Sequence, residues 1–385
     1  MTIKKPWEKE IGPIKAQFKD QFSPRETITA DFDLKEIMET KGKPLSLLII
    51  RNDSIKYENY FDFGKKERAT MGFSLSKGIT ATVVGIAMQE GYLKPTDYIQ
   101  KYIPELNKNV KPITIEQLLN MRANLKQDEL YATLFPTSRI RHMYEGDNLE
   151  KFLIKRTKSA GEPDAYFHYQ STCPMLLSLA VERATGQKFS KYAEEKLWKP
   201  LGMEYDGYVQ TDTKGTARAY AGFAATTRDY AKLGRLYLNG GKINGKQVVH
   251  PDFVAKAMRI EDDLNGYNWS YSFRHNRIFI PLEEYKEEEW LDYPEKAKIN
   301  VNGTEVMAIK HQDQDMMAVG MMGNIMYIHP STNTIIVRTG NDYHTGDLAF
   351  SPIFRAIATG SSQPQPYLKK EQQFLDFVRE IWSLD

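Results

Sequence analysis

The sequence contains little of the material from which metal and cofactor sites are built. Its 385 residues include a single cysteine, Cys173, which excludes a disulfide framework and a zinc site made of cysteines. The seven histidines are scattered and form no H-E-x-x-H or H-x-H pair. A P-loop and a G-x-G-x-x-G after a strand are also missing. We therefore expect no metal and no cofactor, and Cys173 is expected to be a small buried core residue.

Neither sign of charge dominates, and long hydrophobic runs are missing. Lysine plus arginine is 52 and aspartate plus glutamate is 50, so the formal net charge of +2 argues against nucleic acid as a partner. No window reaches about 18 apolar residues, so no membrane span is expected. The opening residues, MTIKKPWEKEIGPIKAQF, lack the apolar core of a signal peptide. The chain as written is expected in the cytoplasm; a periplasmic or secreted location would require that a signal had been removed.

The length and the order of the elements predict one sheet interrupted by helices. A chain of 385 residues with 41% hydrophobic and 26% charged residues is globular, with two domains or one large domain carrying an insertion. Strand patterns lie near both ends and helix patterns in the middle. We predict an α/β (α+β) fold, in which an antiparallel sheet flanked by helices forms from residues 36–79 and 226–385. An all-helical domain is expected from residues 80–225, and an N-terminal arm from residues 1–35.

The individual elements follow from periodicity and from start and stop signals. Two β-rich runs around Asn52-Asp53 predict a hairpin. Thr114 and Gln117 form a T-x-x-Q capping box, and Gly91 ends the helix before it. The acidic run at 283–297 is interpreted as a solvated loop, with a lid over a site as the alternative. The predicted helices span 78–93, the residues from 114 onwards, two helices within 171–197, 227–239 and 372–384, and the late strands span 324–330 and 333–338.

The strongest local motif is Ser74-x-x-Lys77 at the start of an apolar helix. Residues i and i+3 of a helix lie on one face, so the two side chains point the same way. A serine hydroxyl is a poor nucleophile without a base. A lysine acts as that base only where burial or a neighbouring positive charge favours its neutral form. The residues after Lys77 are nearly uncharged as far as Glu90, so the sequence predicts the apolar surroundings that this chemistry requires.

A second motif, Tyr169-x-Ser171, precedes the apolar helix that begins near residue 174. The spacing places a phenol and a hydroxyl on one side of an extended or loop segment. A phenol can carry a proton between a serine, a lysine and a leaving group. Taken alone, Tyr169 could equally be a core tyrosine with a satisfied hydroxyl; its significance depends on Ser74 and Lys77.

Together these residues resemble the serine β-lactamase-like superfamily, which includes penicillin-binding proteins, class C β-lactamases, esterases and 6-aminohexanoate-dimer (nylon oligomer) hydrolases. The resemblance covers roughly residues 45–345 and is closest in motif style to the nylon-oligomer hydrolase and esterase branch. DYIQKYIPEL followed by ITIEQLLNMRANL is similar to the family's next signature. The family usually ends it with Leu-Leu-x-Met-x-Ser-Gly, and Arg122-Ala123-Asn124 departs from this. Ser171 replaces the asparagine of class C enzymes, as in the nylon-oligomer branch.

The third family motif is usually Lys/His-Thr-Gly on a strand that faces the nucleophile. His344-Thr345-Gly346 follows the final hairpin, whereas the family's motif strand precedes it. The matching stretch is therefore AVGMMGN at 318–324, which resembles the Gly-x-x-Gly version, from Gly320 to Gly323. The cation that helps to hold a β-lactam carboxylate is then absent from this motif. His344 is expected at the surface or at the rim of the site.

The resemblance also implies a role for each residue. Ser74 attacks a carbonyl and becomes acylated, Lys77 takes its proton, and Tyr169 passes the proton to the leaving group and then activates water. The backbone N–H groups of Ser74 and Met321 are the implied oxyanion donors. Substrate contacts are implied for Ser171, Gly320, Met322, Gly323, Tyr267 and Trp269, where packing is an equal alternative for the two aromatic residues.

The sequence thus predicts a serine hydrolase that cleaves small amides or carboxylic esters through an acyl-enzyme. One alternative is a β-lactamase or D-Ala-D-Ala carboxypeptidase-type penicillin-binding enzyme. Another is a catalytically silent relative that binds a ligand, although a binding protein has no need for Ser74, Lys77 and Tyr169 together. The expected partner is a small-molecule ester or amide, and a homodimer is left open.

Overall fold

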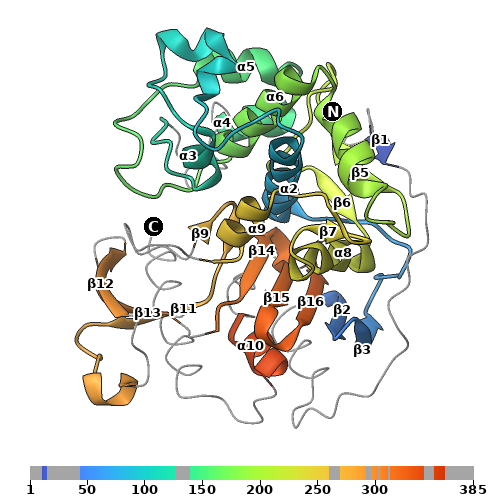
Figure 1. Cartoon of the computed structure of the whole chain (residues 1–385), viewed down its shortest axis with the longest axis vertical. Helices are drawn as coiled ribbons and strands as arrows, with labels where there is room; N and C mark the ends of the chain where they lie inside the picture. Colours follow the sequence, from blue (N-terminus) through green and yellow to red (C-terminus); the bar gives the residue numbers. More distant parts are fainter. Residues whose placement is uncertain are drawn as a thin grey trace, which may run out of the picture.

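The computed structural model shows a lobe of helices above a large sheet, with the helix α2 (Ser76–Gln89) running between them (Figure 1). In the part of the chain that the structure describes, no helix is both long and apolar enough to cross a membrane. The described residues are 11–14, 44–126, 139–259, 269–291, 296–301, 304–310, 313–341 and 351–359.

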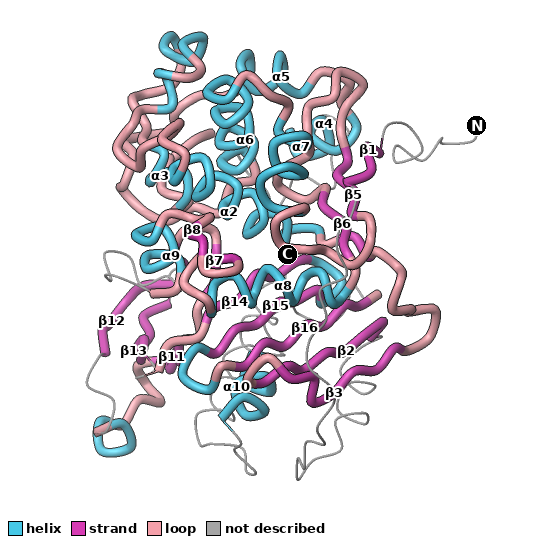
Figure 2. The backbone as a smooth tube through the Cα atoms, turned by 45° about the vertical axis from the view of Figure 1, so that its right-hand side comes forward, coloured by secondary structure: helices cyan, strands magenta, loops and turns pink. Residues whose placement is uncertain are grey.

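The large sheet is antiparallel and is assembled from both ends of the described chain (Figure 2). The strand β2 (Pro44–Arg51) pairs with β16 (Thr334–Gly340), so that Ile50 lies opposite Ile335. This pairing confirms the predicted sheet, because it joins the N-terminal hairpin to the last strand. In spatial order the seven strands are β3 (Ser54–Tyr60), β2, β16, β15 (Asn324–His329), β14 (Met316–Gly320), β10 (Phe273–Arg274) and β9 (Trp269–Ser270).

The predicted hairpin at Asn52-Asp53 is confirmed. Both residues have positive φ, 49° and 61°, as a two-residue turn that matches the twist of its strands requires. Asparagine and aspartate tolerate this left-handed region better than other residues with a side chain. The turn therefore follows from local sequence alone.

The helix α2 is buried from Ser76 to Met88, and it packs against α6 on one side and β14 on the other. Gly78 permits the second contact, because a Cβ there would lie 2.8 Å from the Phe273 ring and 3.1 Å from the Ala318 Cβ. Gly91, with φ +80°, follows the end of the helix as predicted. The other α-helices of the described residues are α3 (Ile115–Leu119), α4 (Arg139–Glu145), α5 (Leu149–Arg156), α6 (Thr172–Thr185), α7 (Phe189–Ala193), α8 (Thr227–Leu238), α9 (Pro251–Ala257) and α10 (Ser351–Thr359).

Start and stop signals explain the bounds of these helices. The Thr114 hydroxyl accepts from the Gln117 N–H at 3.1 Å while the Gln117 side chain accepts from the Thr114 N–H at 2.9 Å, so the capping box is confirmed. α6 ends at Gly186, which has φ +70°. α7 then continues into a π-helical turn, Glu194–Trp198. The predicted helix at 372–384 lies outside the described residues.

The segment 80–225 is not helical throughout. It contributes the short strands β5 (Gly207–Gln210) and β6 (Phe223–Ala225), which pair with each other. β4 (Thr70–Met71), just before the Ser74 motif, pairs with β6. From the predicted arm, β1 (Ile11–Ile14) pairs with β5. A further hairpin consists of β7 (Lys242–Ile243) and β8 (Lys246–Gln247).

A three-stranded sheet lies at the edge of the molecule and carries the acidic run (Figure 1). Three exposed glutamates precede Trp290 in a 3-10 turn, whereas Trp290 itself is 3% exposed and packs with Ile280 and Ile309. The described part of the run is therefore anchored by a buried side chain and is not a fully solvated loop. The strands are β11 (Arg277–Pro281), β13 (Thr304–Lys310) and β12 (Lys296–Val301).

A buried charge network ties α10 to the face of the large sheet opposite α8. The Arg355 guanidinium contacts Asp313 and lies 3.2 Å from Asp315, which also accepts the Tyr327 hydroxyl at 2.6 Å. His329, fully buried, lies 3.1 Å from Asp313. Burial alone would raise the pKa of Asp313, but the hydrogen bond from His329 and the charge of Arg355 outweigh it and hold that pKa below its usual range.

The low pKa of Asp313 predicts a loss of stability in acid. A carboxyl whose pKa is depressed by folding stabilises the protein above its unfolded pKa of about 4, and this contribution is lost as pH falls below that value. Asp313→Asn should therefore lower the free energy of unfolding more at pH 7 than at pH 3, as measured by urea denaturation. Asp252→Asn, at an exposed carboxylate, is the control and should have a small effect at both pH values. An Asp313→Asn effect of equal size at both pH values would contradict the assignment.

Candidate active site

Ser74 lies in a strained turn at the mouth of α2. The turn, Phe73–Leu75, is a short 3-10 helix, and Phe73 has φ +48°, a conformation that is unfavourable for a bulky residue. Neighbouring hydrogen bonds hold the turn: the Gly72 N–H donates to the Phe223 carbonyl at 2.8 Å. The strand before the turn is held as well, because the Tyr230 hydroxyl donates to the Thr70 carbonyl at 2.8 Å. Burial raises the pKa of Tyr230, so this hydroxyl keeps the proton that it donates. Strain maintained by surrounding contacts is common where a reactive side chain must be held in place.

Lys77 lies one turn further along and is 1% exposed. Its Nζ lies 3.0 Å from the Ser74 Oγ and 3.1 Å from the Tyr220 carbonyl oxygen. The same Nζ lies 4.8 Å from the centroid of the Tyr169 ring and 5.6 Å from that of Tyr220. The amine is therefore within reach of the serine proton and lies between a backbone carbonyl and two aromatic rings.

Tyr169 is positioned by a loop that is attached to the segment after α3. The neighbouring Gln170 is fully buried; its amide accepts from the Leu125 N–H at 3.1 Å and donates to the Leu125 carbonyl at 2.6 Å. The His168 N–H donates to the Met121 carbonyl at 2.9 Å. Ser171, also buried, occupies the N-cap position of α6. The structure thus places the Tyr169 ring and Ser74 Oγ near the same Lys77 Nζ; the catalytic roles of the three residues stay a prediction.

The departure at Arg122-Ala123-Asn124 has a structural reason. Asn124 has φ +46°, which lies in the left-handed region that favours glycine. The motif that this segment resembles ends in glycine at the same position. The Asn124 side chain compensates by donating to the Glu162 carbonyl at 2.9 Å and accepting from the Tyr166 hydroxyl at 3.0 Å. Asparagine tolerates this conformation better than most residues, so the substitution preserves the turn.

The Gly-x-x-Gly stretch lies against the nucleophile turn. A Cβ on Gly320 would lie 1.9 Å from the Gly72 carbonyl oxygen, so only glycine fits at this point. Beyond it, Met322 has φ +67°. Asn324 donates to the Met321 carbonyl at 2.6 Å and to the Met71 carbonyl at 3.3 Å, which links this bend to the strand before Ser74. The oxyanion role of the Met321 N–H stays a prediction.

This close approach predicts a large effect for Gly320→Ala. The added methyl group must displace the backbone near Ser74, which would move the predicted oxyanion donors out of alignment. We expect kcat for ester hydrolysis to fall by about 10²–10³, the usual effect of losing one such donor. Gly186→Ala, which is strained by its φ of +70° but has no atom within 4 Å of the added Cβ, is the control and should lower stability while leaving kcat unchanged. Unchanged kcat in Gly320→Ala would show that this strand does not shape the site.

The ring of Trp269 packs against the ring of Tyr169. The two rings are perpendicular, with centroids 5.5 Å apart, and the Trp269 indole N–H donates to the Leu119 carbonyl at 3.1 Å. Tyr267 and His344, which the sequence also singled out, lie outside the described residues. Sequence reasoning missed Tyr220 and Arg274; the Arg274 guanidinium carbon lies 5.8 Å from the Tyr169 ring centroid. No motif identifies either residue, because each comes from a distant part of the chain.

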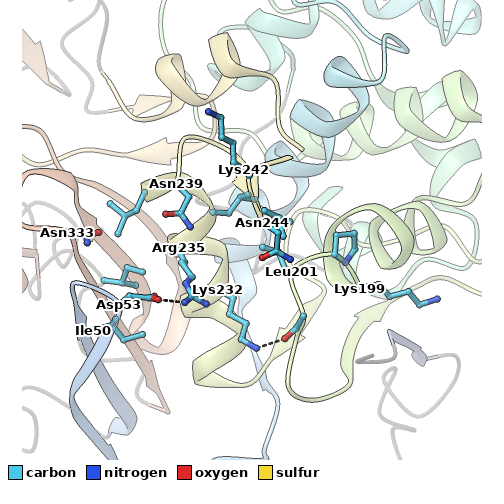
Figure 3. Close-up of a pocket in the computed structure, with 17 residues that line it drawn as sticks. Ile50, Asp53, Lys199, Leu201, Lys232, Arg235, Asn239, Lys242, Asn244 and Asn333 are labelled. Atoms are coloured by element: carbon cyan, nitrogen blue, oxygen red, sulfur yellow. Dashed lines mark hydrogen bonds and ion pairs between the residues drawn. The ribbon is translucent and has the colours of Figure 1, made fainter. Parts of the chain in front are cut away.

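A cavity of about 820 Å³ lies elsewhere, between α8, the β2–β3 turn and the segment that follows α7 (Figure 3). Ser74 and Tyr169 are not among its lining residues. Two of its cations have partners within the protein: Arg235 pairs with Asp53, and Lys232 donates to the Gly202 carbonyl (Figure 3). Within the described ranges, no group of three or more potential metal ligands occurs. The chemistry therefore points to Ser74 and its neighbours rather than to this cavity.

Comparisons with known proteins show the family and the fold of the chain. The Beta-lactamase family model matches residues 34–275. The 6-aminohexanoate-dimer hydrolase of Paenarthrobacter ureafaciens is 25% identical over 304 residues, covering 76% of this chain and 71% of that protein. An Escherichia coli K12 protein with the provisional name D-alanyl-D-alanine carboxypeptidase is 29% identical over 343 residues, covering 78% and 79%. A solved Bacillus anthracis structure, provisionally named a 6-aminohexanoate-dimer hydrolase, shares the fold with a TM-score of 0.72 at 19% identity and 92% coverage of each chain.

The antiparallel sheet with helices on its faces and a helical lobe above it has the fold of the β-lactamase and penicillin-binding protein class. The chain belongs to the β-lactamase family. The predicted superfamily and fold are confirmed, and so, at the level of the family, is the prediction of a β-lactamase-related serine hydrolase.

Proposed function

We propose that the protein hydrolyses small carboxylic esters or amides through a covalent acyl-enzyme on Ser74. The observation that carries this proposal is the 3.0 Å separation of Lys77 Nζ and Ser74 Oγ in a site where the lysine is 1% exposed. An amine at hydrogen-bond distance from a serine hydroxyl is placed to act as the base that the serine needs. The relatives named as a 6-aminohexanoate-dimer hydrolase and, provisionally, as a D-alanyl-D-alanine carboxypeptidase support a hydrolytic reaction.

The reaction proceeds in two displacements. In the first, a bond forms between Ser74 Oγ and the carbonyl carbon while the proton of Ser74 moves to Lys77. The bond to the alcohol or amine then breaks, and Tyr169 delivers the proton to that leaving group. In the second, water attacks the acyl carbon, its proton returns through Tyr169 and Lys77 to Ser74, and the carboxylic acid is released.

Charge that develops on the carbonyl oxygen requires donors that are already in place. We assign this role to the backbone N–H groups of Ser74 and Met321, since Gly320 brings the two segments into contact. The turn at Phe73 and the bend at Met322 both use positive φ, 48° and 67°, and both are held by hydrogen bonds from neighbouring strands. Such fixed backbone donors need no reorganisation during the reaction.

A second candidate activity is the cleavage of β-lactams or of D-Ala-D-Ala peptides. It is favoured by the similarity to the Escherichia coli protein with the provisional carboxypeptidase name. The Gly320-to-Gly323 stretch argues against it, because it has no lysine or histidine at the motif. A fluorescent penicillin distinguishes the two: no adduct on Ser74 would exclude the second candidate while leaving ester and amide hydrolysis intact.

The proposal is tested by covalent labelling. A fluorophosphonate reacts with an activated serine, so it should modify the protein at Ser74, as located by peptide mass spectrometry. The Ser74→Ala variant should remain unlabelled. A protein that folds but takes up no label at Ser74 would instead be a catalytically silent, ligand-binding member of the family.

A further inference from the structure

The loop that carries Tyr169 has no regular secondary structure of its own. Residues 160–170 are all described by the structure, and they form neither helix nor strand. A loop of this kind takes its shape from the scaffold that it contacts. Here the contacts come from residues 121–126, which follow α3 and run beside the loop. The position of Tyr169 therefore depends on that segment.

Backbone hydrogen bonds align the loop with this segment. In each of the following bonds, a loop N–H donates to a carbonyl of the segment: Ala160 to Asn124 at 2.8 Å, Asp164 to Arg122 at 2.8 Å, and His168 to Met121 at 2.9 Å. The donors follow one another at four-residue intervals, and the last of them directly precedes Tyr169. Almost every residue type provides these backbone groups. The bonds therefore do not explain why the Asn124 side chain is buried against the loop.

The Asn124 amide joins the two segments through its side chain. Asn124 is 3% exposed, and its amide donates to the Glu162 carbonyl at 2.9 Å and accepts from the Tyr166 hydroxyl at 3.0 Å. Gly161 provides the space for this amide, because a Cβ there would lie 2.6 Å from Asn124 Nδ2. Both polar atoms of the side chain are thus bonded to the loop in an enclosed position.

The hydrogen bond to Tyr166 leads toward Tyr169. The Tyr166 ring stacks on that of His168, with centroids 6.1 Å apart and 30° between the planes, and His168 is the residue before Tyr169. Tyr166 is 46% exposed, so its own burial does not hold it in place. The hydrogen bond to Asn124 fixes it instead, and with it the chain that enters Tyr169.

We propose that Asn124 is a positioning residue for proton transfer by Tyr169. Its amide holds the loop so that the Tyr169 hydroxyl meets the leaving group. The inference rests on the proposed function, in which Ser74 is acylated and Tyr169 delivers the proton. It gives the departure at Arg122-Ala123-Asn124 a role in the reaction in addition to preserving the turn.

Two esters with the same acyl group test the proposal. p-Nitrophenyl acetate and p-nitrobenzyl acetate form the same acetyl-enzyme, and kcat/KM reports on its formation. A p-nitrophenolate leaves readily as an anion, whereas the benzyl alkoxide requires a proton. Asn124→Gly keeps the turn, since glycine accepts positive φ, and removes only the amide. We expect kcat/KM to fall about tenfold to a hundredfold for the benzyl ester, part of the usual contribution of proton transfer, and less than about threefold for the phenyl ester.

Further variants locate the effect in the Asn124 amide. Gly161→Ala should cause the same selective loss, because its methyl group displaces that amide, and the φ of Gly161 lies outside the left-handed region. In the Asn124→Gly background the same change should have little further effect, since the amide is already absent. Asn244→Gly is the matched control, at an exposed asparagine with φ +48° in the β7–β8 turn, and should leave both rates unchanged.

Other results overturn the inference. Equal losses on both esters in Asn124→Gly would show that Asn124 supports only the fold, and native rates on both would show that the loop holds Tyr169 without it. Tyr169→Phe sets the full size of the selective loss. Equal losses on both esters in that variant would leave Asn124 no proton transfer to position. None of these results removes Ser74 from the mechanism, which would follow only if Ser74→Ala hydrolysed p-nitrophenyl acetate at the native rate.

Discussion

Replacing Ser74 by alanine should lower kcat/KM for p-nitrophenyl acetate by about 10⁴–10⁶, close to complete loss of enzymatic turnover. The substitution removes the atom that forms the acyl bond. Binding and oxyanion stabilisation would remain, so a rate somewhat above the uncatalysed reaction is expected to persist. Because Lys77 Nζ lies 3.0 Å from Ser74 Oγ, the variant also removes one contact of a buried amine, and a small change in stability should accompany the kinetic effect.

A second buried serine provides the control for this variant. Ser178 is 3% exposed, lies on α6, and donates to the Met175 carbonyl at 2.9 Å. Ser178→Ala also deletes a buried hydroxyl, but away from the turn, so kcat/KM should stay within about twofold of the native value while thermal stability falls slightly. Native turnover by Ser74→Ala would remove Ser74 from the mechanism.

Lys77→Met should lower kcat by about 10³–10⁴, at the upper end of the usual contribution of a general base. Methionine fills much of the same volume without an amine. No other cation in the described part of the chain contacts Ser74 Oγ, so nothing replaces the lost base. KM should change little, since the amine accepts a proton and does not hold the substrate.

Lys232→Met is the matched control for the lysine variant. Lys232 is also 1% exposed, but it lies on α8, where it donates to the Gly202 carbonyl and is 3.7 Å from Glu204. Its replacement leaves Glu204 and the Gly202 carbonyl without this cation and should destabilise the fold, with kcat unchanged at a temperature where the variant is folded. If both lysine variants lost kcat equally, the removal of a buried amine, and not the loss of a proton acceptor, would explain the effect of Lys77→Met.

Much of the fold follows from local sequence. Asn52-Asp53 supplies two residues that accept positive φ, and Thr114 with Gln117 supplies a reciprocal cap, so these turns and helix starts need no tertiary information. The Ser74–Lys77 spacing likewise determines that both side chains share one face. These are the features that the sequence predicted correctly.

The remaining features depend on contacts between distant segments. The turn at Tyr271-Ser272 has no Asn-Gly or Asp-Gly signal and exists because Asn120 and Glu116 hold it. Arg274 therefore could not be placed beside Tyr169 from the sequence. Lys77 contacts Tyr220 through the backbone carbonyl of Tyr220. Every residue type has such a carbonyl, so the sequence gives no signal for this contact. The strands β5 and β6 are too short to give an alternating pattern, and they form by pairing with residues far along the chain.

The most direct test of the central claim is detection of the acyl group itself. Native protein would be mixed with excess p-nitrophenyl acetate, quenched in acid within milliseconds to seconds, digested, and analysed by mass spectrometry. We predict that the peptide containing Ser74 gains the mass of one acetyl group, that fragmentation assigns it to Ser74, and that the adduct disappears as substrate is consumed. Rapid turnover with no acetyl group on Ser74 at any quench time, or with the acetyl group on another residue, would contradict the account.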